Sequence, residues 1–237
     1  MTNMTQGPWA RIRPLQIDDV DAKIAAAIKT GELTRGGLPN NLVKVMAHCP
    51  RFVQLEVEYA NSFMFDPVTY VGDLKTAGFN DRFLKELVIS RTSLLNHSHY
   101  SVTHHSLVGT EREHENHPDV YTERERVVLD YTAKVSQDAH TINDQDFADL
   151  RKVLEAHNRT DARLNDLEDA AMARHVDSQI VELTWLIGHS YLLNRWFTAL
   201  QVPDEGPLDQ SDFLTSYEQV VPADIRERNA RIVGGGF

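Results

Sequence analysis

Apolar residues recur along this chain three and four positions apart, which is the period of an α-helix. The clearest run contains Leu84, Leu87, Val88, Thr92 and Leu95, and it predicts a helix with one side facing a core. The two-residue alternation of half-buried strands and the tight Asn-Gly or Asp-Gly turns between them are missing from the sequence. The pattern therefore predicts an all-α protein built as a helical bundle.

Capping and breaking residues predict where the helices begin and end. Asn80 is a suitable N-cap, Thr122 and Glu125 have the spacing of a capping box, and Pro50 must follow the end of a helix. We expect helices over residues 18–29, 42–47, 51–64, 81–95 and 179–200, and two more that begin at Thr122 and Thr141.

Composition and charge narrow the class of protein. Hydrophobic residues make up 41% and charged residues 25% of the 237 positions, as in ordinary globular proteins. The net charge of −11 argues against nucleic acid and anionic membrane surfaces as partners, because both attract basic patches. No apolar run is long enough to span a bilayer, and no secretory signal is visible at the N-terminus. We expect a cytoplasmic protein with no membrane and no nucleic-acid partner.

Cys49 is the one cysteine of the chain. It excludes a disulfide within the chain and a thiolate zinc site.

Four of the eleven histidines lie within nine residues, at His97, His99, His104 and His105. On a helix no single face presents more than two of them well, so we expect no metal ion there. The cluster could instead be a solvated surface, or it could transfer protons near neutral pH.

Small polar residues share a face with one of these histidines. Ser98, Ser101 and His105 follow the helical positions i, i+3 and i+7, so they form a polar stripe. A carboxylate, Glu86, lies in the apolar helix just before them. Glu86 could also be an exposed helix residue, or could pair with Lys85 or Arg91.

The stretch from Glu86 to His105 resembles the signature of the carboxymuconolactone decarboxylase family, which includes the alkyl hydroperoxidase D proteins. Redox members of that family have a Glu, a Cys-x-x-Cys beginning twelve residues later, and a His four residues after the second Cys. In this chain Glu86 and His105 match, whereas Ser98 and Ser101 stand at the cysteine positions. A serine hydroxyl cannot replace a thiolate nucleophile, so redox chemistry is not expected.

The resemblance to non-redox members of the family implies a lyase without a cofactor, acting on a small organic acid or lactone. His105 would be the general acid or base, and Glu86 would orient it or share its proton. Ser98, Ser101 and Tyr100 would donate hydrogen bonds to a carbonyl or enolate oxygen. The same groups would serve an isomerase, a dehydratase or a lactone hydrolase. A serine nucleophile, a peroxidase and a binding or assembly protein without catalysis are further alternatives.

Polar residues on the last long helix and in the histidine cluster are candidates for substrate binding. Arg195 could hold a carboxylate, because a guanidinium binds carboxylates with two parallel hydrogen bonds. Glu182 and His189 share a face and could complete a pocket opposite His105, or could join helices by hydrogen bonds. The expected substrate-binding residues are Tyr100, His97, His104, His189 and Arg195.

The resemblance extends over roughly residues 35–203 and divides the chain into three parts. We expect an N-terminal arm and helix over residues 1–34, the family-like helical domain over 35–203, and a C-terminal tail over 204–237. Trp185, Leu192, Leu193 and Trp196 crowd the last long helix with apolar surface. With the resemblance, they predict a homo-oligomer, which would be a dimer, trimer or hexamer.

Overall fold

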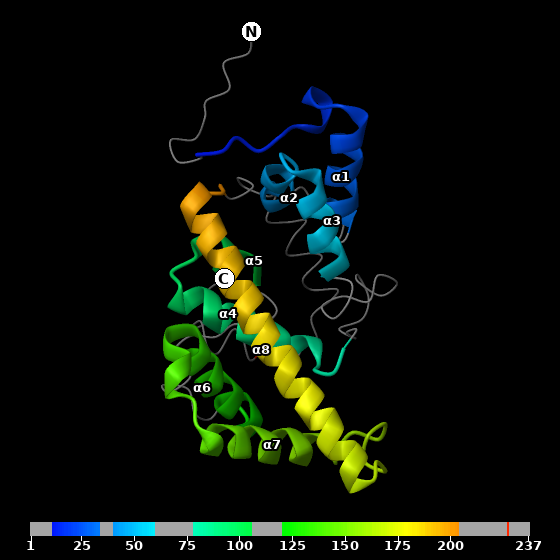
Figure 1. Cartoon of the computed structure of the whole chain (residues 1–237), viewed down its shortest axis with the longest axis vertical. Helices are drawn as coiled ribbons and strands as arrows, with labels where there is room; N and C mark the ends of the chain where they lie inside the picture. Colours follow the sequence, from blue (N-terminus) through cyan, green and yellow to red (C-terminus); the bar gives the residue numbers. More distant parts are fainter. Residues whose placement is uncertain (1–10, 34–39, 60–77, 106–119, 204–226, 228–237) are drawn as a thin grey trace. The chain divides into compact units, whose positions relative to one another are not determined.

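A computed structural model describes residues 11–33, 40–59, 78–105, 120–203 and 227. Every regular element within these residues is a helix, and none is a strand, so the prediction of an all-α protein is confirmed. The elements in chain order are η1 (Ile17–Asp19), α1 (Ala22–Leu33), α2 (Asn41–Met46), α3 (Pro50–Tyr59), α4 (Arg82–Leu95), α5 (His99–His105), α6 (Glu123–Asp138), η4 (Ala139–Thr141), α7 (Asp144–Asn158) and α8 (Asp169–Leu200) (Figure 1).

The chain forms two compact units, and α8 passes from one to the other between Asn194 and Arg195. In the first unit α1 packs against α2 and α3. Its core contains Ile28, Val43 and Val53, all less than 3% exposed.

The second unit carries the residues of interest and begins at Gly78. Its helix α4 packs against α5 and α6, and α6 packs against α7. Leu87, Tyr121 and Leu129 form a buried cluster within it. Helix α8 is tied to α6 by a hydrogen bond of 2.8 Å between the hydroxyls of Tyr131 and Thr184.

The start of α4 corrects one prediction. Asp81, not Asn80, is the N-cap, because its Oδ1 accepts from the backbone N–H of Leu84 at 2.9 Å. The amide of Asn80 instead donates to Gln179 and Glu182 of α8. The sequence did not separate two adjacent capping residues, since the choice depends on a contact with a distant helix.

Two other helices begin later than predicted. Residues 17–19 form the 3₁₀ turn η1, and Asp21 caps α1 by accepting from the N–H groups of Lys23 and Ile24. Helix α7 begins after Asn143, whose side chain forms a capping box with Asp146, rather than at Thr141.

Helices also differ from prediction at other ends. Helix α1 continues through Gly31 to Leu33 instead of ending at residue 29, and α8 begins ten residues before position 179. Met172 and Val176, both at most 2% exposed, bury this added part of α8. The capping box of Thr122 and Glu125 at the start of α6 is confirmed.

Some predictions fall on residues that are not described. The end of the helix over 51–64 beyond Tyr59, the arm over residues 1–10 and nearly all of the tail over 204–237 lie outside the described residues. The three-part division of the chain stays a prediction. Within the helices that are described, none is long and apolar enough to cross a membrane.

Candidate active site

Glu86 lies on the buried face of α4, and both of its carboxylate oxygens are engaged. Its side chain is 1% exposed. Oε2 lies 2.7 Å from Nδ1 of His105, and Oε1 accepts from Nε of Arg82, one helical turn earlier on α4. The contact between Glu86 and His105 that the sequence predicted is therefore present.

The charge of Glu86 fixes the orientation of the histidine. Burial raises the pKa of Glu86, but the positive charges of Arg82 and His105 and their hydrogen bonds outweigh it and lower the pKa to about 2. An ionised carboxylate only accepts hydrogen bonds, so Nδ1 of His105 carries a proton. In the neutral ring Nε2 then holds the lone pair. The His105 side chain is 29% exposed, which leaves the ring open to solvent.

A reversal of the chain between α4 and α5 brings the two residues together. His97 has a left-handed backbone with φ of 53°, and its N–H donates to the carbonyl of Leu94 at 3.0 Å. The N–H of Ser98 donates to the carbonyl of Ser93 at 3.0 Å. These two bonds define a Schellman motif, which ends α4 and directs α5 back along it.

Below the histidine, two serine hydroxyls join α4 to α5. Oγ of Ser93 lies 2.6 Å from the carbonyl of Ile89 and 2.8 Å from Oγ of Ser101. Since Ser93 has one proton and gives it to Ile89, the hydroxyl of Ser101 donates to Ser93. Asn194 of α8 approaches the same oxygen at 3.4 Å. Ser101 is one helical turn before His105 on α5.

Two more serines, one on α4 and one just before α5, are buried. Ser90 is one turn after Glu86 on α4, and Ser98 directly precedes α5. Both are at most 2% exposed, and neither hydroxyl has a hydrogen-bond partner among the described residues. We call Ser90, Ser93, Ser98 and Ser101 the serine seam. All four are buried, and Ser93 and Ser101 are joined by a hydrogen bond.

The remaining residues of the histidine cluster lie in different environments. Tyr100 is 6% exposed, and its ring stacks on that of His104 with centroids 4.1 Å apart. Nδ1 of His104 lies 2.6 Å from the backbone carbonyl of Tyr100. His97 and His99 are exposed.

Glu182 of α8 belongs to a structural network rather than to the pair. It accepts from Nζ of Lys85 at 2.9 Å, from the N–H of Asn80 at 2.8 Å and from the N–H of Phe79. Lys85 is fully buried, and burial lowers its pKa while Glu182 opposes that shift. Gly78, with φ of 100°, lies next to Lys85 and Glu182, and a Cβ there would meet Oε1 of Glu182 at 1.9 Å.

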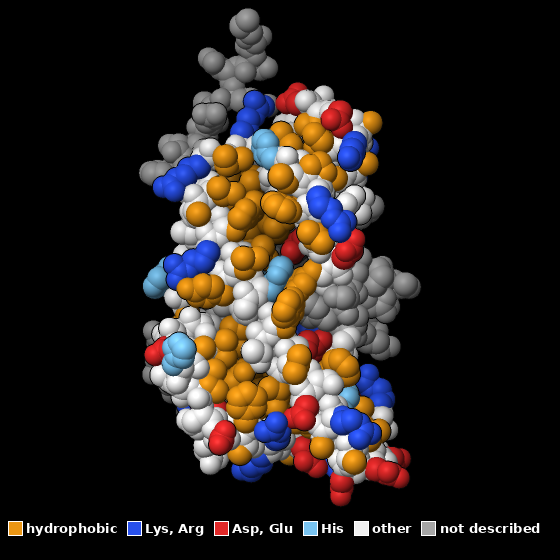
Figure 2. Space-filling model, viewed as in Figure 1, with side chains coloured by type: hydrophobic (Ala, Val, Ile, Leu, Met, Phe, Trp, Pro, Cys, Tyr) orange, Lys and Arg blue, Asp and Glu red, His pale blue; other side chains and the backbone are white. Residues whose placement is uncertain are grey.

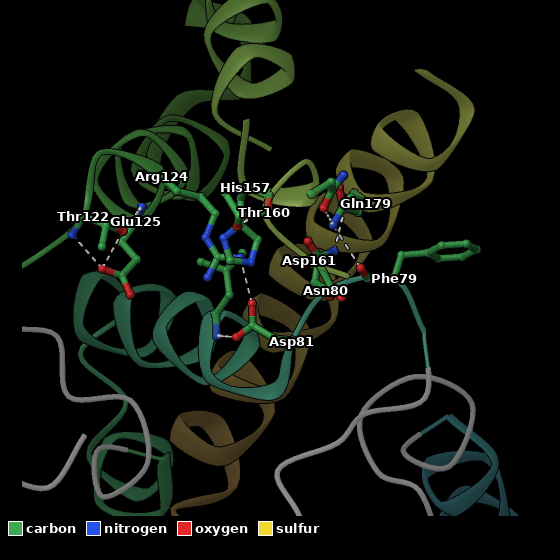
Figure 3. A network of polar contacts seen from close by, with 12 residues as sticks. Phe79, Asn80, Asp81, Thr122, Arg124, Glu125, His157, Thr160, Asp161 and Gln179 are labelled. Carbon is green, nitrogen blue, oxygen red and sulfur yellow. Dashed lines mark hydrogen bonds and ion pairs between the residues drawn. The ribbon is translucent and has the colours of Figure 1, made fainter. Parts of the chain in front are cut away.

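Figure 3 shows how polar contacts hold the start of α4 in place. Asn80 donates to the carbonyl of Gln179 at 3.0 Å, and Gln179 donates to the carbonyl of Phe79 at 3.0 Å. Arg124 of α6 donates to Oδ2 of Asp81 at 2.8 Å. Two neighbouring helices therefore fix the first turn of α4, and with it the position of Glu86 one turn later.

The other two expected substrate-binding residues lie on α8. His189 is half-buried in the second unit, whereas Arg195 is exposed and begins the segment of α8 that belongs to the first unit. Their role in binding stays a prediction.

Arg82 is the residue at this site that the sequence pattern did not single out. Lys85, one of the two cations expected beside Glu86, pairs with Glu182 instead. The i, i+4 spacing of Arg82 and Glu86 is the usual one for a helical ion pair and was the available signal. Within the described residues no three His, Cys, Asp or Glu side chains converge as metal ligands would. Cys49 is exposed and lies in the first unit.

Comparison with known proteins supports the fold. The structure is similar to the crystal structure of an alkylhydroperoxidase AhpD core, an uncharacterized peroxidase-related protein from Ralstonia eutropha JMP134. The TM-score is 0.54 at 21% sequence identity, over 85% of this chain and 95% of that one. No family model and no curated protein matches the chain. The likeness establishes an all-α fold of the alkyl hydroperoxidase D-like type.

Proposed function

We propose that this protein is a cofactor-independent enzyme that transfers protons with the Glu86–His105 pair, acting as a lyase on a small organic acid or lactone. The observation that supports it is the 2.7 Å contact between a buried, ionised carboxylate and a histidine that remains open to solvent. Paired groups of this kind are the usual equipment of general acid–base catalysis.

In this proposal His105 acts through Nε2. The lone pair of Nε2 removes a proton from the substrate, and the imidazolium that forms is stabilised by Glu86. Glu86 is a positioning residue, because its pKa of about 2 keeps it from accepting the proton near neutral pH. Arg82 keeps Glu86 ionised and in place.

The serine seam would stabilise the oxygen that gains charge in the reaction. The hydroxyl of Ser98 has no partner among the described residues, whereas Ser101 would exchange its hydrogen bond to Ser93 for one to the substrate. Tyr100 adds a third hydroxyl on α5. Hydrogen bonds from such groups to an enolate oxygen stabilise the charge that develops there. His97, His104, His189 and Arg195 are the proposed groups for binding the rest of the substrate.

A screen in heavy water tests the proposal across a whole class of compounds. Small carboxylic acids and lactones are incubated with the protein in D₂O, and deuterium uptake, loss of CO₂ and ring opening are followed by NMR. At least one compound should react with the wild type, and His105→Gln should slow that reaction by roughly 10²–10⁴. Cys49→Ser is the matched control and should react at the wild-type rate. A reaction that survives His105→Gln would exclude this mechanism.

A further inference from the structure

Helix α8 exposes apolar side chains in a single line. Val181, Trp185 and Leu192 are 69%, 65% and 63% exposed, and Gly188 lies between the last two. Their spacing of four, three and four residues places them on one face of the helix, and we call these four residues the α8 stripe. Figure 2 shows hydrophobic side chains along α8 on the side facing the viewer. Leu193 and Trp196, also expected at a subunit interface, are half-buried.

The lack of charge on the stripe, rather than its size, favours a second copy of the chain as its partner. The three large side chains expose roughly 400 Å² of apolar surface, about as much as the largest patch of a typical monomer. No charged side chain is exposed on α8 between Val181 and Leu192. In a chain with a net charge of −11, this strip is therefore a place where two copies can meet without like-charge repulsion.

The order of residues within the stripe is self-complementary. Val181 and Leu192 lie equally far from the midpoint between positions 186 and 187, and so do Trp185 and Gly188. When two copies of a helix pack antiparallel across a two-fold axis at that midpoint, residues at equal distances come level with each other. Trp185 then meets the partner's Gly188, and Val181 meets the partner's Leu192. Trp185, the largest side chain of the stripe, therefore lies opposite Gly188, which has no side chain.

Gly188 leaves the room that this match needs. A Cβ placed on Gly188 would have no atom within 4 Å, so the surface there is open. A glycine in the middle of a helix costs stability relative to alanine, and no contact among the described residues requires it at this position. An indole ring from a second copy fills the open surface.

We propose that two copies of this chain associate through α8, antiparallel, with Trp185 seated on the partner's Gly188. The spacing of the stripe is that of the seam of a coiled coil, in which antiparallel helices bring a positions level with d positions. With about 800 Å² buried in total, the dimer is a weak one, and we expect a Kd on the order of micromolar.

Sedimentation of the full chain at concentrations from about 1 μM to about 100 μM tests the association. The mass should rise from 26.9 kDa to twice that value. Trp185→Ala and Gly188→Leu should each raise the Kd at least tenfold. Because the surface at Gly188 is open, Gly188→Leu should not unfold the monomer, and thermal unfolding checks this. Ala148→Leu, on the exposed side of α7, is the matched control and should leave the Kd unchanged.

Crosslinking tests the direction of the helices. In a Cys49→Ser background, chains with Val181→Cys are mixed with chains with Leu192→Cys and treated with a short thiol crosslinker. Antiparallel pairing predicts crosslinks between the two kinds of chain and few within either kind. Crosslinks within each kind would indicate parallel pairing and overturn the proposal. A monomer at every concentration, or a dimer that both stripe variants leave intact, would also overturn it.

Discussion

At the scale of single residues, the ionised state of Glu86 determines both the stability of the folded chain and the orientation of His105. Its side chain is buried, and Arg82 and His105 occupy its two oxygens. Buried carboxylates persist in folded proteins when they are paired in this way. Both contacts therefore stabilise the folded chain, and the ionised carboxylate also fixes the orientation of the His105 ring.

The low pKa of Glu86 predicts how stability depends on pH. The folded-state pKa is about 2 and the ordinary value is 4.5, so ionised Glu86 stabilises the folded chain above pH 4.5. This contribution decreases as the pH falls from 4.5 toward 2. At pH 7, Glu86→Gln should therefore lower the free energy of unfolding by about 3 kcal/mol, and the difference from wild type should shrink below pH 4. Urea unfolding at several pH values measures it, and a difference that is constant with pH would contradict it.

The left-handed backbone of His97 predicts a stabilising substitution. Its φ of 53° is costly for a residue with a side chain but not for glycine. His97→Gly should raise the free energy of unfolding by about 1 kcal/mol. Gln201→Gly, at the same position of the turn after α8, should behave alike. His99→Gly, on the adjacent helix, is the control and should not stabilise. Thermal unfolding of the three variants decides the matter.

At the scale of elements, α4 depends on contacts that no local pattern reveals. The sequence predicted its apolar face and its end near Leu95. It did not predict that Lys85 is buried against Glu182, 97 residues away, because an isolated helix pattern assigns a lysine to the surface. The same holds for Asn80, which joins α8 rather than capping α4.

The buried pair of Lys85 and Glu182 predicts unequal effects of its two members. Glu182→Gln leaves the ammonium of Lys85 buried without its counter-charge, and should cost about 3–5 kcal/mol. Lys85→Met should cost less, because Glu182 keeps its hydrogen bonds from Phe79 and Asn80. Urea unfolding of both variants measures the difference. Equal losses of stability in the two variants would contradict this prediction.

At the scale of the whole molecule, the sequence predicts the fold more completely than it predicts the contacts within the candidate site. Helical spacing predicted the fold class, and the likeness to an alkylhydroperoxidase AhpD core at 21% identity confirms it. The contact of Glu86 with His105 was implied by the family resemblance, in which Glu86 orients His105. The environments of Tyr100 and His104 could not be predicted from the sequence. Helical spacing shows which side of a helix a residue is on, but not which residues of other elements contact it.

The chain as a whole is not expected to carry thiol chemistry. Cys49 is its one cysteine and lies in the first unit, whereas Glu86 and His105 lie in the second. We expect no thiol-dependent turnover of peroxide, and Cys49→Ala should change any native activity by less than about threefold, since the thiolate would be the nucleophile. A coupled peroxide assay checks the first expectation. A large loss of activity in a folded Cys49→Ala protein would contradict the second.

The measurement that tests the central claim most directly is the tautomer of His105 in solution. Long-range ¹H–¹⁵N spectra of the histidine-labelled protein distinguish the two ring nitrogens, and His105→Gln identifies the signals among the eleven histidines. Held by ionised Glu86, the neutral ring should carry its proton on Nδ1 and its lone pair on Nε2, and Glu86→Gln should remove that preference. A neutral ring with its proton on Nε2 in the wild type, or a ring unaffected by Glu86→Gln, would contradict the account.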